Sequence, residues 1–458
     1  MATDIIDALA RLATTTRYED LPDAVVENAK RLLLDSIGCA LGGVTTDPGK
    51  MAISIARELG GRPECAILGT GDRVSITNAV FANGQLVNAL DFDTVMPGGH
   101  TPPYVIPTVL AMAEREGSTG RDLILATAIA CEIGARIQLA LPPSMGFHGP
   151  EREFRYAKRE GYARINFGAA AGAARLRGLD HDAMVSAMAL AGHMSQLNTW
   201  SRGNYALPRN MSKYGFPGWQ NTGAITSIMF AERGMLGDIE LLDDAEHGYG
   251  EFSGYGGWEP QRIVEGIGER WLIAAPIRLK PYACCTMLHG GVQAFEEILA
   301  EQRLHPDEID RVIATASPTV EATLFTDRSM NNIVDLQFGM HYVLAMVAHG
   351  ERTGADWHDW NKLTDPKITR FADRVELLPQ PDFAETELST VTVEARGQRY
   401  TASRAGYTAP LTNDEVAAKF RDNATRCLTA KDAETALAGL IALDDVDSVP
   451  ELVRALAA

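Results

Sequence analysis

The 458-residue sequence predicts a mainly α-helical protein in two domains, a large all-helical domain and a smaller α+β domain. Two observations lead to this prediction. Ala, Leu, Met and Ile at helical spacing dominate roughly the first 265 residues, whereas β-prone segments begin only after Trp271. We therefore expect a helical domain at 1–270, joined by C-terminal helices at 405–458, and an α+β domain at 271–404.

The first strong helical signal runs from Pro22 to Ala40. Its apolar residues recur every 3.6 positions, and Pro22 stands near the first turn, where its missing N–H is not needed. Further helices are predicted at 79–89, 106–115, 122–138, 168–177, 182–191 and 224–232. The segments 93–103 and 201–219 are dense in Gly, Pro, Asn and Trp, so we expect loops with room for function there.

The second half changes character. Residues 309–316 are β-prone, and 391–394 and 399–403 flank an Arg396-Gly397 turn, which is typical of a hairpin. Helical patterns follow at 291–302, 338–348, 413–428 and 433–443. The last two could rejoin the first domain.

Charge and cysteine content exclude several classes of function. Lys and Arg number 42 against 60 Asp and Glu, a net charge of −18, so nucleic acid and anionic membranes are not expected partners. The six cysteines have neither C-x-x-C spacing nor disulfide-scaffold density. Asp4 and Asp7 stand where a signal peptide would be basic, and no apolar run would span a bilayer, so we expect a cytoplasmic protein.

Common cofactor motifs are missing from the sequence. It contains no G-x-G-x-x-G after a strand, no P-loop, no H-E-x-x-H and no G-x-S-x-G. We therefore expect chemistry by side chains alone, with no cofactor and no metal. An anionic substrate would then need a local group of Lys, Arg or His.

The most informative stretch runs from Asn83 to Thr94, followed after a Pro-Gly-Gly loop by His100. It supplies the Asp91 and Asp93 carboxylates, a hydroxyl and an imidazole within a short span, which is a plausible acid/base cluster. Two alternatives stay open. The aspartates could simply cap or solvate a helix end, or Asp91, Asp93 and His100 could bind a divalent metal for hydrolysis.

This stretch resembles a motif of the MmgE/PrpD family, which contains 2-methylcitrate dehydratase, cis-aconitate decarboxylase and iminodisuccinate epimerase. The resemblance continues in order along the chain, through Leu32–Gly38, Gly146-Phe147-His148, Met211-Ser212-Lys213, Leu279-Lys280-Pro281-Tyr282, His289, Leu336-Gln337-Phe338, Pro410-Leu411-Thr412 and Lys419-Phe420. It implies a large helical domain, a smaller α+β domain and a homodimer.

The resemblance also implies the site residues. Catalytic roles would fall to Asp91, His100, Lys213, Lys280 and His148, and substrate binding to Thr94, Cys285 and Tyr282. Two lysine ammonium groups could hold substrate carboxylates and stabilise an enolate-like charge. Taken alone, each lysine would be an ordinary surface residue, and His148 could equally be a buried hydrogen-bonded histidine.

Three departures from the family pattern affect the transfer of a particular activity. The segment Asp91 to Thr94 and the loop to His100 are each shortened, so the position of Thr94 is open. Asn88 stands where a histidine is common. Cys285 replaces a histidine of the dehydratases and the decarboxylase, and a thiol cannot shuttle protons near neutral pH without a lowered pKa.

An insertion at 149–166 also departs from the family. It mixes arginines and lysines with glutamates, and one interpretation is a solvated charged helix with i,i+4 pairs such as Glu151 with Arg155. The other is a substrate lid in which an arginine binds an additional carboxylate.

We expect a cofactor-independent lyase, a dehydratase or decarboxylase, that acts α to a carboxylate of a small di- or tricarboxylic acid. Because Cys285 removes a histidine, an epimerase or isomerase that transfers protons at that carbon is the alternative. A non-catalytic binding protein is a further possibility. The sequence does not identify the acid, because family members share a scaffold and differ in one cleft.

Overall fold

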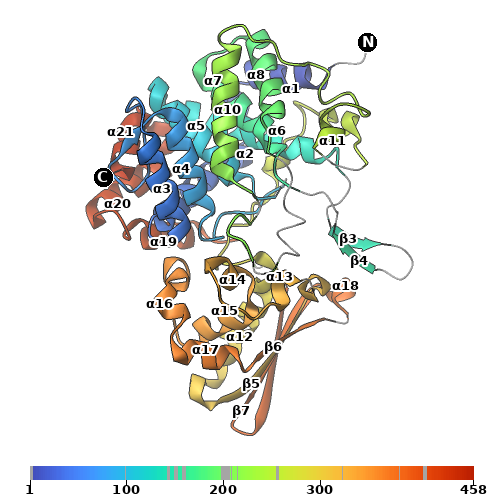
Figure 1. The fold of residues 1–458 in the computed structure, drawn as a ribbon, viewed down its shortest axis with the longest axis vertical. Coiled ribbons are helices and arrows are strands. Elements are labelled where there is room, and N and C mark those ends of the chain that lie inside the picture. Colours follow the sequence, from blue (N-terminus) through green and yellow to red (C-terminus); the bar gives the residue numbers. More distant parts are fainter. Residues whose placement is uncertain are drawn as a thin grey trace.

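The computed structural model places most of the chain. It describes residues 4–97, 99–141, 145–148, 153–156, 161–196, 207, 209–213, 215–253, 257–321, 323–380, 382–405 and 410–457. Figure 1 shows a large bundle of helices above a smaller part that contains a sheet. Over the described ranges, no helix combines the length and the apolar character that crossing a membrane would need.

The upper part is helical, as the sequence predicts. Its longer helices are α1 Ile5–Thr15, α2 Asp23–Gly43, α3 Asp47–Leu59, α4 Ile76–Asn88, α5 Pro102–Glu116, α6 Gly120–Gln138, α7 Ile165–Arg177, α8 His181–His193 and α10 Pro217–Ala231. Each predicted helix between residues 22 and 232 is present. Helices α1 and α3 were not predicted.

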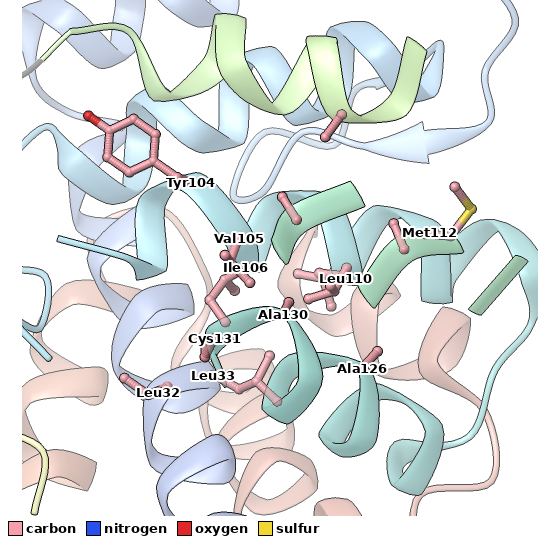
Figure 2. Close-up of a cluster of buried hydrophobic side chains, with 14 of the residues drawn as sticks. Leu32, Leu33, Tyr104, Val105, Ile106, Leu110, Met112, Ala126, Ala130 and Cys131 are labelled. Carbon is pink, nitrogen blue, oxygen red and sulfur yellow. The ribbon is translucent and has the colours of Figure 1, made fainter. Parts of the chain in front are cut away.

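Small residues allow these helices to pack closely. A side chain on Gly168 of α7 would come within 2.2 Å of the Ala130 carbonyl of α6, so the two backbones nearly touch. Figure 2 shows the core beside them, where Leu33 of α2 and Leu110 of α5 lie near Ala130. This apolar cluster fixes α4 and α5, which flank the candidate site.

The lower part is an α+β unit with a four-stranded sheet. Strands β5 Ile309–Ala316, β6 Val375–Pro379, β7 Leu388–Ala395 and β8 Gln398–Ala405 lie in the order β6-β5-β7-β8. Strand β6 is parallel to β5, and the other pairs are antiparallel. The predicted β7–β8 hairpin turns at Arg396 and Gly397, with φ 55° and 71°.

Helices complete this unit. They include α12 His289–Gln302, α14 Ile333–Phe338, α15 Met340–Ala348, α16 Trp360–Leu363 and α17 Pro366–Ala372. Phe295 of α12 and Val391 of β7 belong to one apolar core, so the helix packs on the sheet. The helix predicted at 338–348 is divided at Gly339, whose extended backbone separates α14 from α15.

The C-terminal helices return to the upper part. They are α19 Asn413–Ala424, α20 Ala430–Ile441 and α21 Val449–Leu456. Phe420 of α19 packs on Gly38 of α2, where a side chain would come within 3.1 Å of the ring. One core therefore runs from Ile5 to Leu279 and resumes at Val416, and the other spans 282–395. We propose two domains on this basis, with the boundary near residue 280.

Where the structure describes its charged part, at 153–156, the insertion at 149–166 is a strand and not the solvated helix that charge spacing suggested. Strand β3, Met145–His148, pairs with β4, Glu153–Tyr156, and the register sets Phe147 opposite Phe154. Aromatic residues favour strands. The i,i+4 spacing of charges within the insertion says nothing about backbone pairing with the preceding segment.

Glu151 and the side chain of Arg155 lie outside the described residues. Arg164 of the insertion is described: it is buried, and its guanidinium lies over the Tyr162 ring, 5.8 Å from the ring centre. The substrate lid stays a prediction.

Candidate active site

Asp91 is at the centre of the site, just after α4 ends at Asn88. Its carboxylate is fully buried and accepts from two ammonium groups, with Oδ2 3.0 Å from Nζ of Lys280 and Oδ1 3.3 Å from Nζ of Lys213. Burial alone would raise the pKa of Asp91, but Lys280 and Lys213 hold it well below its usual value. Asp91 is therefore a permanent anion between two cations.

The two lysines come from distant parts of the chain, and the structure brings them together. Lys213 lies in the loop before α10, and its Nζ also donates to the Asn88 carbonyl at 3.0 Å. Lys280 lies between the two cores, and its Nζ also donates to the Asp91 carbonyl at 2.7 Å. Both side chains are buried, with 6% and 1% exposed.

The environments of these lysines differ electrostatically. Burial lowers the pKa of Lys213 below its usual value, and Asp91 only partly opposes this effect. For Lys280, burial is outweighed by Asp91 and Asp93, which raise its pKa. Lys280 is thus a fixed cation, and Lys213 is the lysine that loses its proton more readily.

A second pair lies beside this cluster. Nδ1 of His100 is 2.7 Å from Oδ2 of Asp93, and Asn88 donates from Nδ2 to the other Asp93 oxygen at 3.0 Å. Burial has the largest single effect and raises the pKa of Asp93, but His100 and Lys280 together outweigh it and the pKa is lowered. An ionised Asp93 orients the imidazole, so that Nε2 is the ring nitrogen on the opposite edge.

The short loop between Asp93 and His100 still returns the histidine to the aspartate. Met96 and Gly99 exchange backbone hydrogen bonds of 3.1 and 2.8 Å, which closes a tight turn. Gly99 has φ 93°, and a side chain there would come within 2.4 Å of the Tyr162 ring. That ring makes an edge contact with His100, at 5.8 Å between centroids.

Asp91, Asp93 and His100 also meet the spacing of a metal site, with ligand atoms within 4.8 Å of one another. Both Asp91 oxygens, however, face ammonium groups, and both Asp93 oxygens accept hydrogen bonds. A divalent cation would have to displace these contacts beside two positive charges. With these ammonium groups in place, the site suits an anionic ligand better than a metal ion.

The sequence matches known family domains over most of its length. Residues 7–261 match the MmgE/PrpD N-terminal domain, and residues 282–444 match the MmgE/PrpD C-terminal domain. The chain belongs to the MmgE/PrpD family. The resemblance seen in the motifs is confirmed.

Curated relatives of this family member are enzymes. It is 24% identical to the cis-aconitate decarboxylase of Aspergillus terreus over 505 aligned positions, covering 98% of this chain and 96% of the relative. It is 23% identical to the human cis-aconitate decarboxylase over 484 positions, covering 100% and 95%. Family and relatives together indicate that this chain is an enzyme.

Two of the three substrate-binding candidates, Thr94 and Tyr282, hydrogen-bond to acidic side chains. The Thr94 hydroxyl is fully buried and donates its proton to Oδ2 of Asp35 at 2.8 Å. The Tyr282 hydroxyl donates to Glu296, and its ring stacks on Trp357 in the second core. These positions favour structural roles.

Cys285 and His148 complete the candidates. Burial and the charge of Asp91 raise the pKa of the Cys285 thiol to about 12, so it is a neutral group beside the ion cluster. It cannot take over the proton transfer of an imidazole near neutral pH. His148 lies on strand β3, and its side chain is outside the described residues.

Sequence reasoning missed three residues that support the site, His358, Arg209 and Asp335. Gln337 of α14 donates from Nε2 to the Ala89 carbonyl at 2.8 Å and lies 3.1 Å from Nε2 of His358. Arg209 lies in the loop that carries Lys213, and its guanidinium binds Asp335 at 2.8 Å. The Q-F motif marked Gln337, but nothing local marked the other three.

Proposed function

We propose that this enzyme is a cofactor-independent lyase that decarboxylates a small unsaturated tricarboxylate of the cis-aconitate type. The relatives named above support the reaction and the substrate class. The observation that carries the proposal is the Asp91 cluster, in which two buried lysines from separate segments meet next to an Asp–His pair.

The lysines bind and polarise the substrate in this proposal. An ammonium group has three N–H donors, and Asp91 takes two of those of Lys280. The third can donate to a substrate carboxylate. Because the lysines are buried, such a contact is much stronger than it would be in water.

Decarboxylation breaks the bond between a carboxylate carbon and its neighbouring carbon. The electron pair stays on that neighbouring carbon and spreads into the conjugated acid as an enolate-like charge, while CO₂ departs. Lys280, the fixed cation, stabilises this charge. Nε2 of His100 then delivers a proton to one end of this delocalised carbanion, with Asp93 stabilising the imidazolium that donates it.

The test is turnover by purified enzyme. We expect cis-aconitate to lose CO₂ and to give a five-carbon dicarboxylate, with Lys213→Ala reducing kcat by ~10²–10³ because a preorganised charge is lost. Loss or gain of water without CO₂ would favour a dehydratase. Interconversion of substrate isomers would favour the isomerase alternative, and either result would overturn the decarboxylase.

Chelation tests the metal alternative. Full turnover after exhaustive treatment with EDTA is the expected result, because the carboxylates that could bind a metal already face cations. Loss of activity that one divalent ion restores would instead assign Asp91, Asp93 and His100 to a metal centre.

A further inference from the structure

A third lysine lies behind the ion cluster. Lys419 comes from α19, and its Nζ donates to Oδ1 of Asp35 at 2.6 Å, to the Phe92 carbonyl at 2.8 Å and to the Lys280 carbonyl at 3.1 Å. These contacts use all three N–H donors of an ammonium group. Lys419 therefore has no donor left for a substrate, and any effect on the reaction is indirect.

Its partners are the two chain segments that form the cluster. Phe92 follows Asp91 directly, and Lys280 is the residue whose Nζ meets the Asp91 carboxylate at 3.0 Å. One ammonium group thus joins the backbones on both sides of this ion pair. The same group also lies 3.7 Å from the centre of the Phe92 ring, a cation–π contact.

Asp35 of α2 adds a third chain segment to this arrangement. Its carboxylate is fully buried, and the Oδ2 atom accepts from Thr94 at 2.8 Å. The segment from Asp91 to Thr94 is thereby held at both ends, by Lys419 and by Asp35. This matters because Asp91 has φ 51°, a conformation that persists only when its surroundings enforce it.

We propose that Lys419 and Asp35 are positioning residues, which set the distance between the Asp91 carboxylate and the Lys280 ammonium. The kinetic consequence rests on the proposed function. Misplacing a reacting group by about 1 Å can cost ~10²-fold in rate, so the effect belongs in kcat. Because Lys280 also donates to a substrate carboxylate in the proposed function, KM should rise too, by a smaller factor than kcat falls.

The kinetic test compares three variants. Lys419→Met removes the ammonium, and the double variant Lys419→Met/Asp35→Asn also removes the carboxylate, so that no unpaired charge is buried. We expect kcat to fall ~10²-fold in both, with a smaller rise in KM. Lys30→Met is the matched control, because Lys30 also joins α2 to the C-terminal segment, through Asp444, but does not contact the site.

A second readout needs no substrate. With ¹³C-labelled aspartate, and Asp91→Asn to assign the signal, the Asp91 carboxylate should stay ionised at every pH at which the wild type is folded. In the double variant the lysines are displaced, so the pKa of Asp91 should rise into the range of the folded protein. A purely structural role for Lys419 would not move this titration.

Failure of the proposed function and failure of the positioning role give different results. If wild-type enzyme decarboxylates no tricarboxylate, the proposed function fails and the titration still decides the positioning role. The positioning role is overturned if kcat of the double variant matches that of Lys30→Met, or if the Asp91 titration does not change. It is also overturned if neither variant folds, because Lys419 would then serve the fold alone.

Discussion

Two residues of the ion cluster have backbone conformations that residues with side chains rarely adopt. Asp91 has φ 51° and Lys213 has φ 43°, and each conformation costs about 1–2 kcal/mol. Contacts with residues far away in the sequence hold both conformations, and a local sequence pattern does not predict such contacts. Asp91 is held by the lysines, and Lys213 by the Asn88 carbonyl. Such strain at a buried charge cluster is typical of a site whose geometry matters more than its stability.

The lowered pKa of Lys213 gives a prediction for pH dependence. Only the ammonium form can bind a carboxylate, and burial shifts its loss of a proton below the usual lysine pKa of 10.5. Activity should therefore fall as pH rises, at a pH lower than an ordinary lysine would give. The profile of log kcat/KM against pH measures this limb.

Lys213→Arg is the matched variant for that profile, because a guanidinium group keeps its proton at every accessible pH. We expect a slower enzyme in which the basic limb is absent or displaced upward. A limb at the same pH in both proteins would assign it to another group and would contradict the role of Lys213.

Among the elements, the loop before α10 and helix α14 are coupled. Arg209 donates to the Leu324 and Asp327 carbonyls at 2.9 and 2.8 Å and forms a buried ion pair with Asp335. Asp335 belongs to α14, which also carries Gln337 to the end of α4. The second domain thus fixes the loop from which Lys213 enters the site.

Arg209→Met should loosen this loop. We expect a fall in kcat/KM of about 10–100-fold, because Lys213 is no longer held at Asp91. Arg311→Met is the control, since Arg311 forms an exposed pair with Glu376 on the sheet of the same domain. Steady-state kinetics on both variants, with thermal unfolding curves, separates the two effects. Equal activity in the two variants would contradict the coupling.

Elements differ in how far their sequence predicts them. Strand β5 has the predicted bounds because its β-prone residues are contiguous. Strand β6, only five residues long and ending at Pro379, was missed, since its pairing with β5 is parallel and joins distant segments. Helix α1 could have been found, because Ile5, Leu9 and Leu12 are buried at helical spacing.

Over the whole molecule, the site lies where the two cores meet. Asp91 and His100 belong to the helical part, Lys280 lies at the junction, and α14 reaches across through Gln337. The protein carries a net charge of −18, so only a local group of lysines can attract a carboxylate. The cluster at the junction is such a group.

The pairings of the supporting residues could not be predicted from sequence. The motifs singled out Asp91, His100, Lys213 and Lys280, and the structure brings these together. The contact of Lys419 with Asp35 spans 384 positions, and that of Arg209 with Asp335 spans 126. Such pairings depend on the assembled fold, and no local spacing indicates them.

The central claim is that the lysines stabilise a carbanion-like state which then takes a proton from the enzyme. Incubation of cis-aconitate with the enzyme in D₂O, followed by NMR, tests it most directly. We predict loss of CO₂ and one deuterium in the product, on one of the carbons over which the carbanion charge is spread, with both abolished in Lys280→Met. Turnover that leaves every carbon of the product without deuterium, or Lys280→Met with wild-type kcat, would contradict the account.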